Sequence, residues 1–359
     1  MVVVSLVTLG SPDQVTGGYL YHRRMADAAP GHGAELLFVS FARERFVAAA
    51  RRAGAVMALT RRQGAQLIVV DSIAAGMLAP WLRIHQVDVP MVAILHQPPG
   101  GIDHGPVVTW VRAVLDSSTY RRARRLLSAS QALAGELESR GFPRSRIRVV
   151  PPGRDVALAP DGPVGDLRRG HHVAFLSVGN WVARKGILPL LDAFATLPSE
   201  AASLHLVGDQ DRDPSYTARV RARMGAADLA GRVVAHGPVT KEDVAAFYAA
   251  ADVFVLPSWT EPYGTVYGEA MSAGLPVIGW RAGNVVNLAE DGRQGVLVAP
   301  GDVQALAAAM RRLALDDAYR RSLATGARQR AQSLPTWEET AGLFFSNVRE
   351  VLEEVDAAR

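Results

Sequence analysis

Short apolar runs alternate with longer segments of helical spacing along this chain, in two successive series of six runs each. Continuous apolar runs of this length are typical of parallel strands that are buried on both faces, and the segments between them supply the crossover helices. The alternation therefore predicts an α/β protein with two doubly wound parallel sheets. The expected strands are 2–9, 34–40, 66–70, 90–95, 125–129 and 146–150, then 172–178, 202–207, 232–236, 252–256, 275–279 and 294–298.

The chain also contains signals for a domain boundary. A length of 359 residues exceeds one ordinary core. Pro151-Pro152-Gly153 ends the first series, and the following stretch 157–170, rich in Pro, Gly and Asp, is typical of a linker. We expect a first domain over 1–160, a second over 161–337, and a final amphipathic helix over 338–359.

Composition excludes several classes of protein. The chain has no cysteine, so it has no disulfides and no thiol chemistry, which fits a cytoplasmic location. The first nine residues lack the basic leader of a signal peptide and are better interpreted as a first buried strand. The longest apolar stretch, 67–82, is interrupted by Asp71 and Pro80, so we expect no membrane-spanning helix.

Charge is distributed unevenly between the two halves. Residues 1–155 carry 19 Arg against 11 Asp and Glu, a balance of +8, whereas the rest carries 20 basic and 24 acidic residues, a balance of −4. Basic runs such as 120–125 suit a phosphorylated acceptor or the inner membrane surface as a peripheral contact, although solvated helix faces explain most such runs. We expect no nucleic-acid partner, because no aromatic residues interleave with the arginines as a stacking platform needs.

Two carboxylates follow the expected strand 252–256. Glu261 falls in the loop at the carboxyl end of that strand, and Glu269 lies about one turn into a helix that opens at Gly264, Thr265 and Val266. Backbone N–H groups at a helix start attract phosphate, whereas carboxylates bind the hydroxyls of sugar and ribose rings. An isolated pair of this spacing is usually a helix cap and a solvated side chain, so the surrounding pattern decides.

Basic residues and glycines mark two further strand-to-helix turns. Arg184 and Lys185 lie in the turn 179–186, a placement that suits a diphosphate. Gly17 and Gly18 follow the first strand and would let backbone N–H groups approach a phosphate or an acceptor, although a plain tight turn has the same pattern.

A histidine and an aspartate pair also stand at expected strand ends. His96 closes a strand and enters a Gly-Pro-rich loop; a lone His is usually structural, but this placement favours an orienting or hydrogen-bonding role. Asp209-Gln-Asp211 resembles a metal signature of another fold, and we interpret it as a loop and helix cap instead.

The segment 257–279 closely resembles the Glu-x7-Glu signature of family 4 (group 1) retaining glycosyltransferases of the GT-B fold. The turn 179–186 is similar to the basic motif of that family, except that Asn180 stands where an Arg is usual. The segment 281–287 departs from the family pattern, since it lacks a Gly, a Pro and a Glu. The resemblance implies two Rossmann-like domains facing across a cleft, with the last helix crossing back to the first domain.

The same resemblance implies an activity and a set of roles. Glu261 would contact the donor sugar, Glu269 the ribose, and Arg184 and Lys185 the diphosphate, while His96 would reach the donor sugar or the reacting centre. The expected reaction is retaining transfer from a nucleotide sugar, without a metal or other cofactor, to a small-molecule or lipid-linked acceptor held by the first domain.

Two alternatives stay open at the level of sequence. A non-catalytic nucleotide-sugar-binding protein would keep Glu269 and Lys185 but show no turnover. An NAD-dependent oxidoreductase is suggested by the paired α/β domains alone. The first turn, 9–13, lacks the Gly-x-Gly-x-x-Gly spacing that such cofactors favour.

Overall fold

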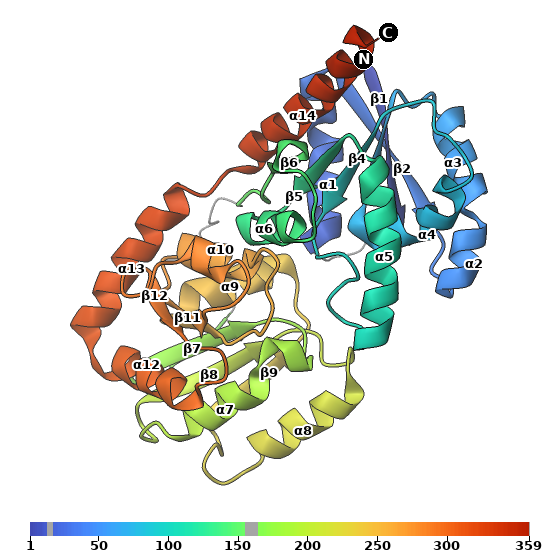
Figure 1. Cartoon of the computed structure of the whole chain (residues 1–359). Coiled ribbons are helices and arrows are strands. Elements are labelled where there is room, and N and C mark those ends of the chain that lie inside the picture. The colour runs from blue at the N-terminus through green and yellow to red at the C-terminus, as the bar shows by residue number, and fades with distance from the viewer. Residues whose placement is uncertain (13–16, 155–163, 359) are drawn as a thin grey trace. The chain divides into compact units, whose positions relative to one another are not determined.

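The computed structural model describes residues 1–12, 17–154 and 164–358, which form two compact units. Unit 1 comprises Met1–Gly153 and Pro335–Arg359, and unit 2 comprises Arg154–Leu334 (Figure 1). The division therefore falls at 153/154 and 334/335, whereas the sequence placed it at 160/161 and 337/338. The expected boundary at residue 160 and the first half of the linker, 157–163, lie outside the described residues.

Unit 1 is built on a parallel sheet with the strand order β2-β1-β3-β4-β5-β6. The chain adds β2 on one side of β1 and then crosses over to add β3 on the other side, so the strand order reverses between β1 and β3. The crevice at the carboxyl ends of strands beside such a reversal is the usual ligand site of open α/β sheets. The strands are β1 (Val2–Leu9), β2 (Ala34–Phe41), β3 (Leu67–Asp71), β4 (Met91–Leu95), β5 (Arg125–Ser128) and β6 (Ile147–Val149).

Helices connect these strands and cover both faces of the sheet. Side chains on β1 alternate between two cores, with Val7 in one cluster and Val4 and Leu6 in the other. This burial on both sides explains why the strands are continuously apolar. The helices are α1 (Gly17–Ala28), α2 (Phe46–Arg51), α3 (Ala53–Arg62), α4 (Ser72–Leu82), α5 (Pro106–Arg122) and α6 (Gln131–Ser139).

Unit 2 repeats this architecture with the strand order β12-β11-β10-β7-β8-β9. Here the order reverses between β7 and β10, because β8 and β9 are added on one side of β7 and β10 on the other. The strands are β7 (Val173–Val178), β8 (Ala202–Val207), β9 (Val233–Gly237), β10 (Val253–Leu256), β11 (Val277–Trp280) and β12 (Gly295–Val298). The helices are α7 (Ile187–Ala195), α8 (Pro214–Met224), α9 (Lys241–Ala250), α10 (Thr265–Ser272), α11 (Val285–Leu288), α12 (Val303–Leu315) and α13 (Asp317–Gln332).

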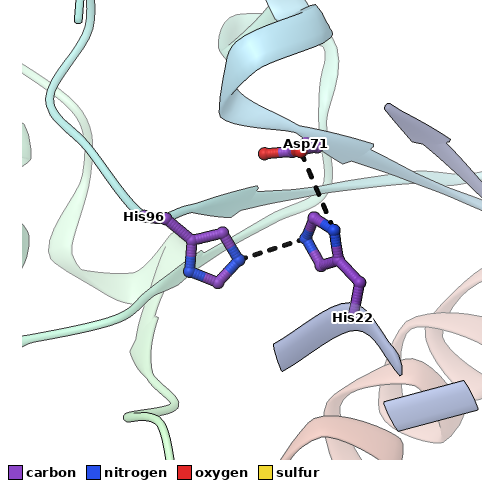
Figure 2. A group of neighbouring side chains, drawn as sticks. All are labelled: His22, Asp71 and His96. Carbon is purple, nitrogen blue, oxygen red and sulfur yellow. Dashed lines mark hydrogen bonds and ion pairs between the residues drawn. The ribbon is translucent and has the colours of Figure 1, made fainter. Parts of the chain in front are cut away.

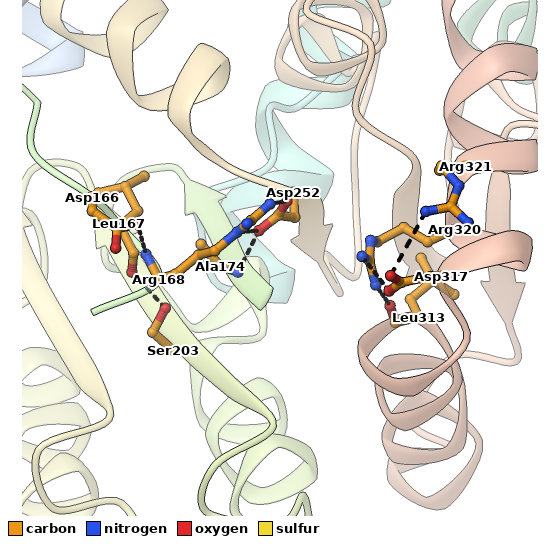
Figure 3. Close-up of polar contacts among 10 residues, drawn as sticks. All are labelled: Asp166, Leu167, Arg168, Ala174, Ser203, Asp252, Leu313, Asp317, Arg320 and Arg321. Atoms are coloured by element: carbon orange, nitrogen blue, oxygen red, sulfur yellow. Dashed lines mark hydrogen bonds and ion pairs between the residues drawn. The ribbon is translucent and has the colours of Figure 1, made fainter. Parts of the chain in front are cut away.

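Asp252, just before β10, fixes the segment that leads into β7 (Figure 3). Its carboxylate accepts hydrogen bonds from Arg168 Nε at 2.9 Å and Nη2 at 2.6 Å, and from the backbone N–H of Ala174 at 2.9 Å. Figure 3 also shows Asp317 with Arg320 and Arg321 at the start of α13. This second group is largely exposed at Asp317, so it contributes little to stability, whereas Asp252 ties two neighbouring strands of the sheet together.

The last helix, α14 (Trp337–Ala357), belongs to unit 1 although it follows unit 2 in sequence. Thr336 and Glu339 form a capping box at its start. Phe344, Phe345 and Val348 pack in the core cluster that contains Val4 and Leu6 of β1. The expectation that the last helix returns to the first domain is therefore confirmed.

All twelve expected strands are present, with ends within two residues of the expected positions. Side chains cap two of the helices: Ser130 accepts a hydrogen bond from the N–H of Leu133, and Asp302 from that of Ala305. In the described part of the chain, no helix has the length and apolar character that crossing a bilayer requires.

We expect Phe344→Ala to lower the free energy of unfolding by about 3–5 kcal/mol, because the ring is fully buried and its removal leaves a cavity. The neighbouring Leu343→Ala is a matched control, since that side chain is 44% exposed. Urea denaturation followed by circular dichroism measures both. Equal losses in the two variants would contradict the packing of α14 on the sheet of unit 1.

Candidate functional site

The loops that follow β7 and β10 are in direct contact at the reversal point of unit 2. A turn of 3₁₀ helix, Ala183–Lys185, ends at Gly186, whose φ is 69°, and a Cβ there would lie 2.0 Å from the carbonyl oxygen of Pro257. Only glycine allows this approach. The carbonyl of Arg184 accepts hydrogen bonds from Trp259 N at 2.8 Å and Ser258 Oγ at 3.0 Å, which locks the two loops together.

This contact brings Lys185 and Glu261 together. Lys185 Nζ donates a hydrogen bond to Glu261 Oε1, and Arg184 Nη1 lies 4.0 Å from the same oxygen. The side chains of Lys185 and Glu261 are only 11% and 8% exposed. Buried charges of this kind are tolerated when they are paired and hydrogen-bonded. The two cations that the sequence assigned to a diphosphate therefore surround the carboxylate that it assigned to a sugar.

The start of α10 completes this group. Gly264, with φ of 89°, is the N-cap, so the backbone N–H groups of Thr265 and Val266 lie in the first turn. Glu269 is half-buried and accepts a hydrogen bond at 3.1 Å from the hydroxyl of Tyr248 on α9. Burial, with the nearby Glu269 carboxylate, raises the pKa of Tyr248 well above its usual value, so this hydroxyl stays protonated and acts as a donor.

Sequence reasoning missed Gly283 and Asn284, in the segment that departs from the family pattern. Gly283 has a φ of 56°, and a Cβ there would lie 2.5 Å from the carbonyl oxygen of Glu261. Asn284 N donates to that same carbonyl at 2.9 Å, and Asn284 Nδ2 donates to the carbonyl of Tyr263 at 2.9 Å. These two residues hold the backbone of Glu261. The only sequence signal was a Gly-Asn turn, which does not reveal its partner.

Gly18 and His96 lie together at the reversal point of unit 1. A Cβ on Gly18 would be 3.5 Å from Cδ2 of His96, so the start of α1 packs closely on the ring. Gly17 is exposed beside it. Gly17, Gly18 and His96 belong to unit 1, whereas Arg184, Lys185, Glu261, Gly264, Thr265, Val266 and Glu269 belong to unit 2.

His96 is in turn held by two residues that the sequence analysis did not single out, His22 and Asp71 (Figure 2). His22 Nε2 lies 3.1 Å from His96 Nε2, and His22 Nδ1 lies 3.8 Å from Asp71 Oδ2. Burial lowers the pKa of both imidazoles to about 3, and it raises the pKa of Asp71. Both rings are therefore neutral near pH 7, and their contact pairs the N–H of one with the lone pair of the other.

Within the described residues, His22, Asp71 and His96 also form a group that could hold a metal ion, because one potential ligand atom of each lies within 4.8 Å of the others. However, Asp71 already accepts hydrogen bonds from Thr8 Oγ1 at 2.7 Å and Ser72 Oγ at 3.2 Å. The two facing Nε2 atoms are likewise at hydrogen-bond distance. The arrangement fits a hydrogen-bonded histidine pair beside a separately bonded carboxylate better than a metal centre.

The Asp-x-Asp segment has a structural role. Asp209 accepts hydrogen bonds from Asp211 N and Arg212 Nε, both at 2.9 Å, and Asp213 caps α8 through the N–H of Tyr216. The interpretation of this segment as a loop and helix cap is confirmed.

A cavity of about 620 Å³ opens in unit 1 beside this reversal point. Leu9, Ser72 and Gln97, which follow or end three neighbouring strands, line its wall. Its ionisable residues are Arg43, Glu44, Asp103, His104, Arg112 and Asp116. Burial and the neighbouring Arg112 lower the pKa of His104. Asp116 accepts a hydrogen bond from Gly100 N at 2.8 Å, and burial raises its pKa to about 6.

The geometry agrees with comparisons to known proteins. Residues 172–316 match the family model "Glycosyl transferases group 1", and residues 2–153 match "Glycosyl transferase 4-like domain". The D-inositol 3-phosphate glycosyltransferase of Xylanimonas cellulosilytica is 30% identical over 288 residues, which cover 74% of this chain and 68% of that protein.

Two solved structures share the fold over the whole chain. Sucrose-phosphate synthase from Thermosynechococcus elongatus superposes with a TM-score of 0.83 at 24% identity and covers 100% of both chains. Anabaena HepE in complex with UDP-glucose gives a TM-score of 0.78 at 21% identity, with 99% of each chain covered.

The chain therefore belongs to the group 1, family 4-like glycosyltransferases and has the GT-B fold. It is an enzyme of the glycosyltransferase class, and this finding removes the oxidoreductase alternative.

The buried histidine pair predicts a pH dependence of stability. Because both folded-state pKa values lie near 3, below the unfolded value of about 6.5, the unfolded chain binds more protons between these limits and stability falls as pH falls. Each histidine contributes a loss of up to about 2 kcal/mol between pH 7 and pH 5, and the raised pKa of Asp71 opposes part of it.

Urea denaturation of the full chain at pH 5, 6 and 7 checks this expectation. The double variant His22→Gln with His96→Gln should flatten the dependence on pH, whereas His85→Gln, at an exposed position, should leave it unchanged. If the free energy of unfolding changes with pH equally in the wild type and the double variant, other titrating groups determine the pH dependence.

Proposed function

We propose that this glycosyltransferase transfers a sugar from a nucleoside diphosphate sugar with retention of configuration, without a metal ion. The observation that carries the proposal is the buried pair of Lys185 and Glu261, with the half-buried Arg184, beside the start of α10. It places two cations and backbone N–H donors next to a carboxylate, as a donor with a charged diphosphate and a hydroxylated sugar requires. The fold neighbour HepE was solved with UDP and with UDP-glucose, which supports a donor of this class.

Each residue of this group has a distinct role in donor binding. Arg184, Lys185 and the N–H groups of Gly264, Thr265 and Val266 bind the diphosphate, Glu261 accepts hydrogen bonds from the sugar hydroxyls, and Glu269 accepts them from the ribose diol. Tyr248 supports this role of Glu269, because its hydroxyl holds one carboxylate oxygen in place. Gly283 and Asn284 do the same for Glu261 through its backbone.

The reaction is a front-face displacement. The bond between the sugar C1 and the phosphate oxygen breaks, the acceptor oxygen bonds to C1 on the same face, and the acceptor proton passes to the departing phosphate oxygen. Arg184 and Lys185 stabilise the charge that develops on the diphosphate, so no protein nucleophile is needed. His96, neutral because of its burial, orients the sugar through a hydrogen bond.

The acceptor occupies the cavity of unit 1, and unit 2 holds the donor. Arg43 and Arg112 give the cavity cationic groups, which suit a polar acceptor with a phosphate. The Xylanimonas relative is a D-inositol 3-phosphate glycosyltransferase, which supports a phosphorylated polyol as one such acceptor. Gly17 and Gly18 offer backbone N–H groups near the same edge. We place the enzyme in the cytoplasm, with its basic first unit facing the inner membrane surface.

Nucleotide binding gives the first test. A nucleoside diphosphate should raise the melting temperature, and the same shift should persist in EDTA because no metal holds the diphosphate. Glu269→Gln should weaken binding by about tenfold or more, since it removes charge-assisted hydrogen bonds to the ribose. Stabilisation that requires a divalent cation would contradict the metal-independent site.

Turnover gives the second test. Lys185→Met and Glu261→Gln should each lower kcat by about 10²–10³-fold, because each removes a group that acts on the diphosphate or the sugar. Exposed Lys241→Met is a matched control. Nuclear magnetic resonance of the product reports the anomeric configuration. Near wild-type turnover in Glu261→Gln, donor binding without turnover in the wild type, or an inverted product would each refute the proposed mechanism.

A further inference from the structure

An apolar patch lies on the first half of α5. Among the described residues, thirteen large hydrophobic side chains are exposed, and five of them lie within the first nine residues of this helix. The patch consists of Val107, Val108, Trp110, Val111 and Val114, which are 75%, 47%, 69%, 44% and 53% exposed. Single exposed apolar residues are normal, whereas a cluster on one element marks a contact surface.

The spacing of the patch makes it one face of the helix. Positions 107, 110, 111 and 114 follow the i, i+3, i+4, i+7 pattern, so their side chains lie above one another. The buried residues of α5 are Ala113, Asp116, Thr119 and Tyr120, which lie on the other side, toward the protein. The patch is therefore the outward face of a helix whose inward face is already packed.

Charge indicates what this face contacts. Arg121 and Arg122 are exposed in the last turn of α5, and Arg121 continues the line of Val107, Trp110 and Val114 along the helix. The one acidic residue of the helix, Asp116, is buried on the opposite side. An apolar and aromatic stripe that leads into arginines matches the surface of an anionic bilayer, where Trp lies at the headgroup level and Arg meets lipid phosphate.

A second copy of this chain fits the face less well. A symmetric dimer brings the same patch of each protomer together, and with it two copies of the basic unit 1 surface. Like charges at an interface oppose association, whereas anionic lipid neutralises them. The charge balance of +8 in residues 1–155 acts in the same direction.

The patch also adjoins the cavity of unit 1. Arg112, which directly follows Val111 on α5, lines the cavity. His104, just before the helix, lines it as well. A Cβ on Gly100 would lie only 2.4 Å from the carbonyl oxygen of Thr109. Helix α5 therefore packs directly on the loop that forms the cavity wall. A membrane bound at the patch would therefore lie near the cavity mouth.

We propose that the outward face of α5 docks this enzyme on an anionic lipid bilayer and thereby presents the unit 1 cavity to acceptors at the membrane surface. The docking assigns to α5 the membrane contact proposed for unit 1 and does not depend on the proposed sugar transfer, whereas the assignment of membrane acceptors rests on that transfer.

Vesicle sedimentation of the full chain tests the docking. The wild type should bind phosphatidylcholine vesicles that contain 30% phosphatidylglycerol, about tenfold more tightly than vesicles of phosphatidylcholine alone, and high salt should weaken the binding. The double variant Trp110→Ser with Val111→Ser and the double variant Arg121→Gln with Arg122→Gln should each bind the anionic vesicles about tenfold less tightly. Ile84→Ser with Leu59→Ser, two exposed apolar positions elsewhere in unit 1, is the matched control and should bind as the wild type does.

Two further measurements separate the outcomes. Stabilisation by a nucleotide should be equal in the wild type and in all variants. If no nucleotide stabilises the wild type, the proposed function is refuted and the docking is unaffected. Trp110 fluorescence, obtained as the difference between the wild type and Trp110→Phe, should shift to the blue with anionic vesicles. The docking is overturned if the wild type ignores anionic vesicles, if the control loses binding equally, or if the patch variants abolish a dimer in size-exclusion chromatography instead.

Discussion

The reversal of strand order within each parallel sheet is the constraint on which the rest of this structure depends. At β1 and β3, and again at β7 and β10, the chain leaves adjacent strands in opposite directions, so their carboxyl ends open into a crevice. The residues that follow those strands meet there whatever their distance in sequence. Lys185 and Glu261 are 76 positions apart, and His22 and His96 are 74 apart, yet each pair is in contact.

Close backbone contact turns this topology into a defined site in unit 2. Gly186 lies against Pro257, and Gly283 lies against Glu261, at distances that no Cβ would permit. Lys185 and Glu261 are buried where these loops meet, and the low local dielectric strengthens their ion pair while it raises the cost of leaving either charge alone. The glycines thus matter through the absence of a side chain, and the charged pair depends on them for its burial.

The sequence was sufficient for the strands, and it singled out candidate site residues where a local signal was present. Twelve apolar runs of strand length predicted one fold class, an α/β protein with two parallel sheets. Lys185, Glu261 and Glu269 each lie near a strand end or a helix start that the sequence marks. Asn284 and His22 could not be found in this way, because their importance comes from partners far along the chain. The spacing of Val107, Trp110 and Val114 was equally ambiguous. Helical periodicity identifies an apolar face, but it does not show whether that face is buried, and here the buried side of α5 contains Asp116 and Thr119.

Electrostatics distinguishes the two reversal points. The site of unit 2 keeps charged groups under partial burial, since Lys185 and Arg184 share the carboxylate of Glu261. The site of unit 1 does the opposite, because burial holds His22 and His96 neutral and raises the pKa of Asp71. A neutral imidazole carries no charge to attract phosphate, and its N–H and lone pair are suited to hydroxyls. Under the proposed function, unit 2 would recognise the diphosphate by charge, and the histidine pair of unit 1 would orient uncharged groups by hydrogen bonds. This division is consistent with a reaction in which negative charge develops on the leaving group.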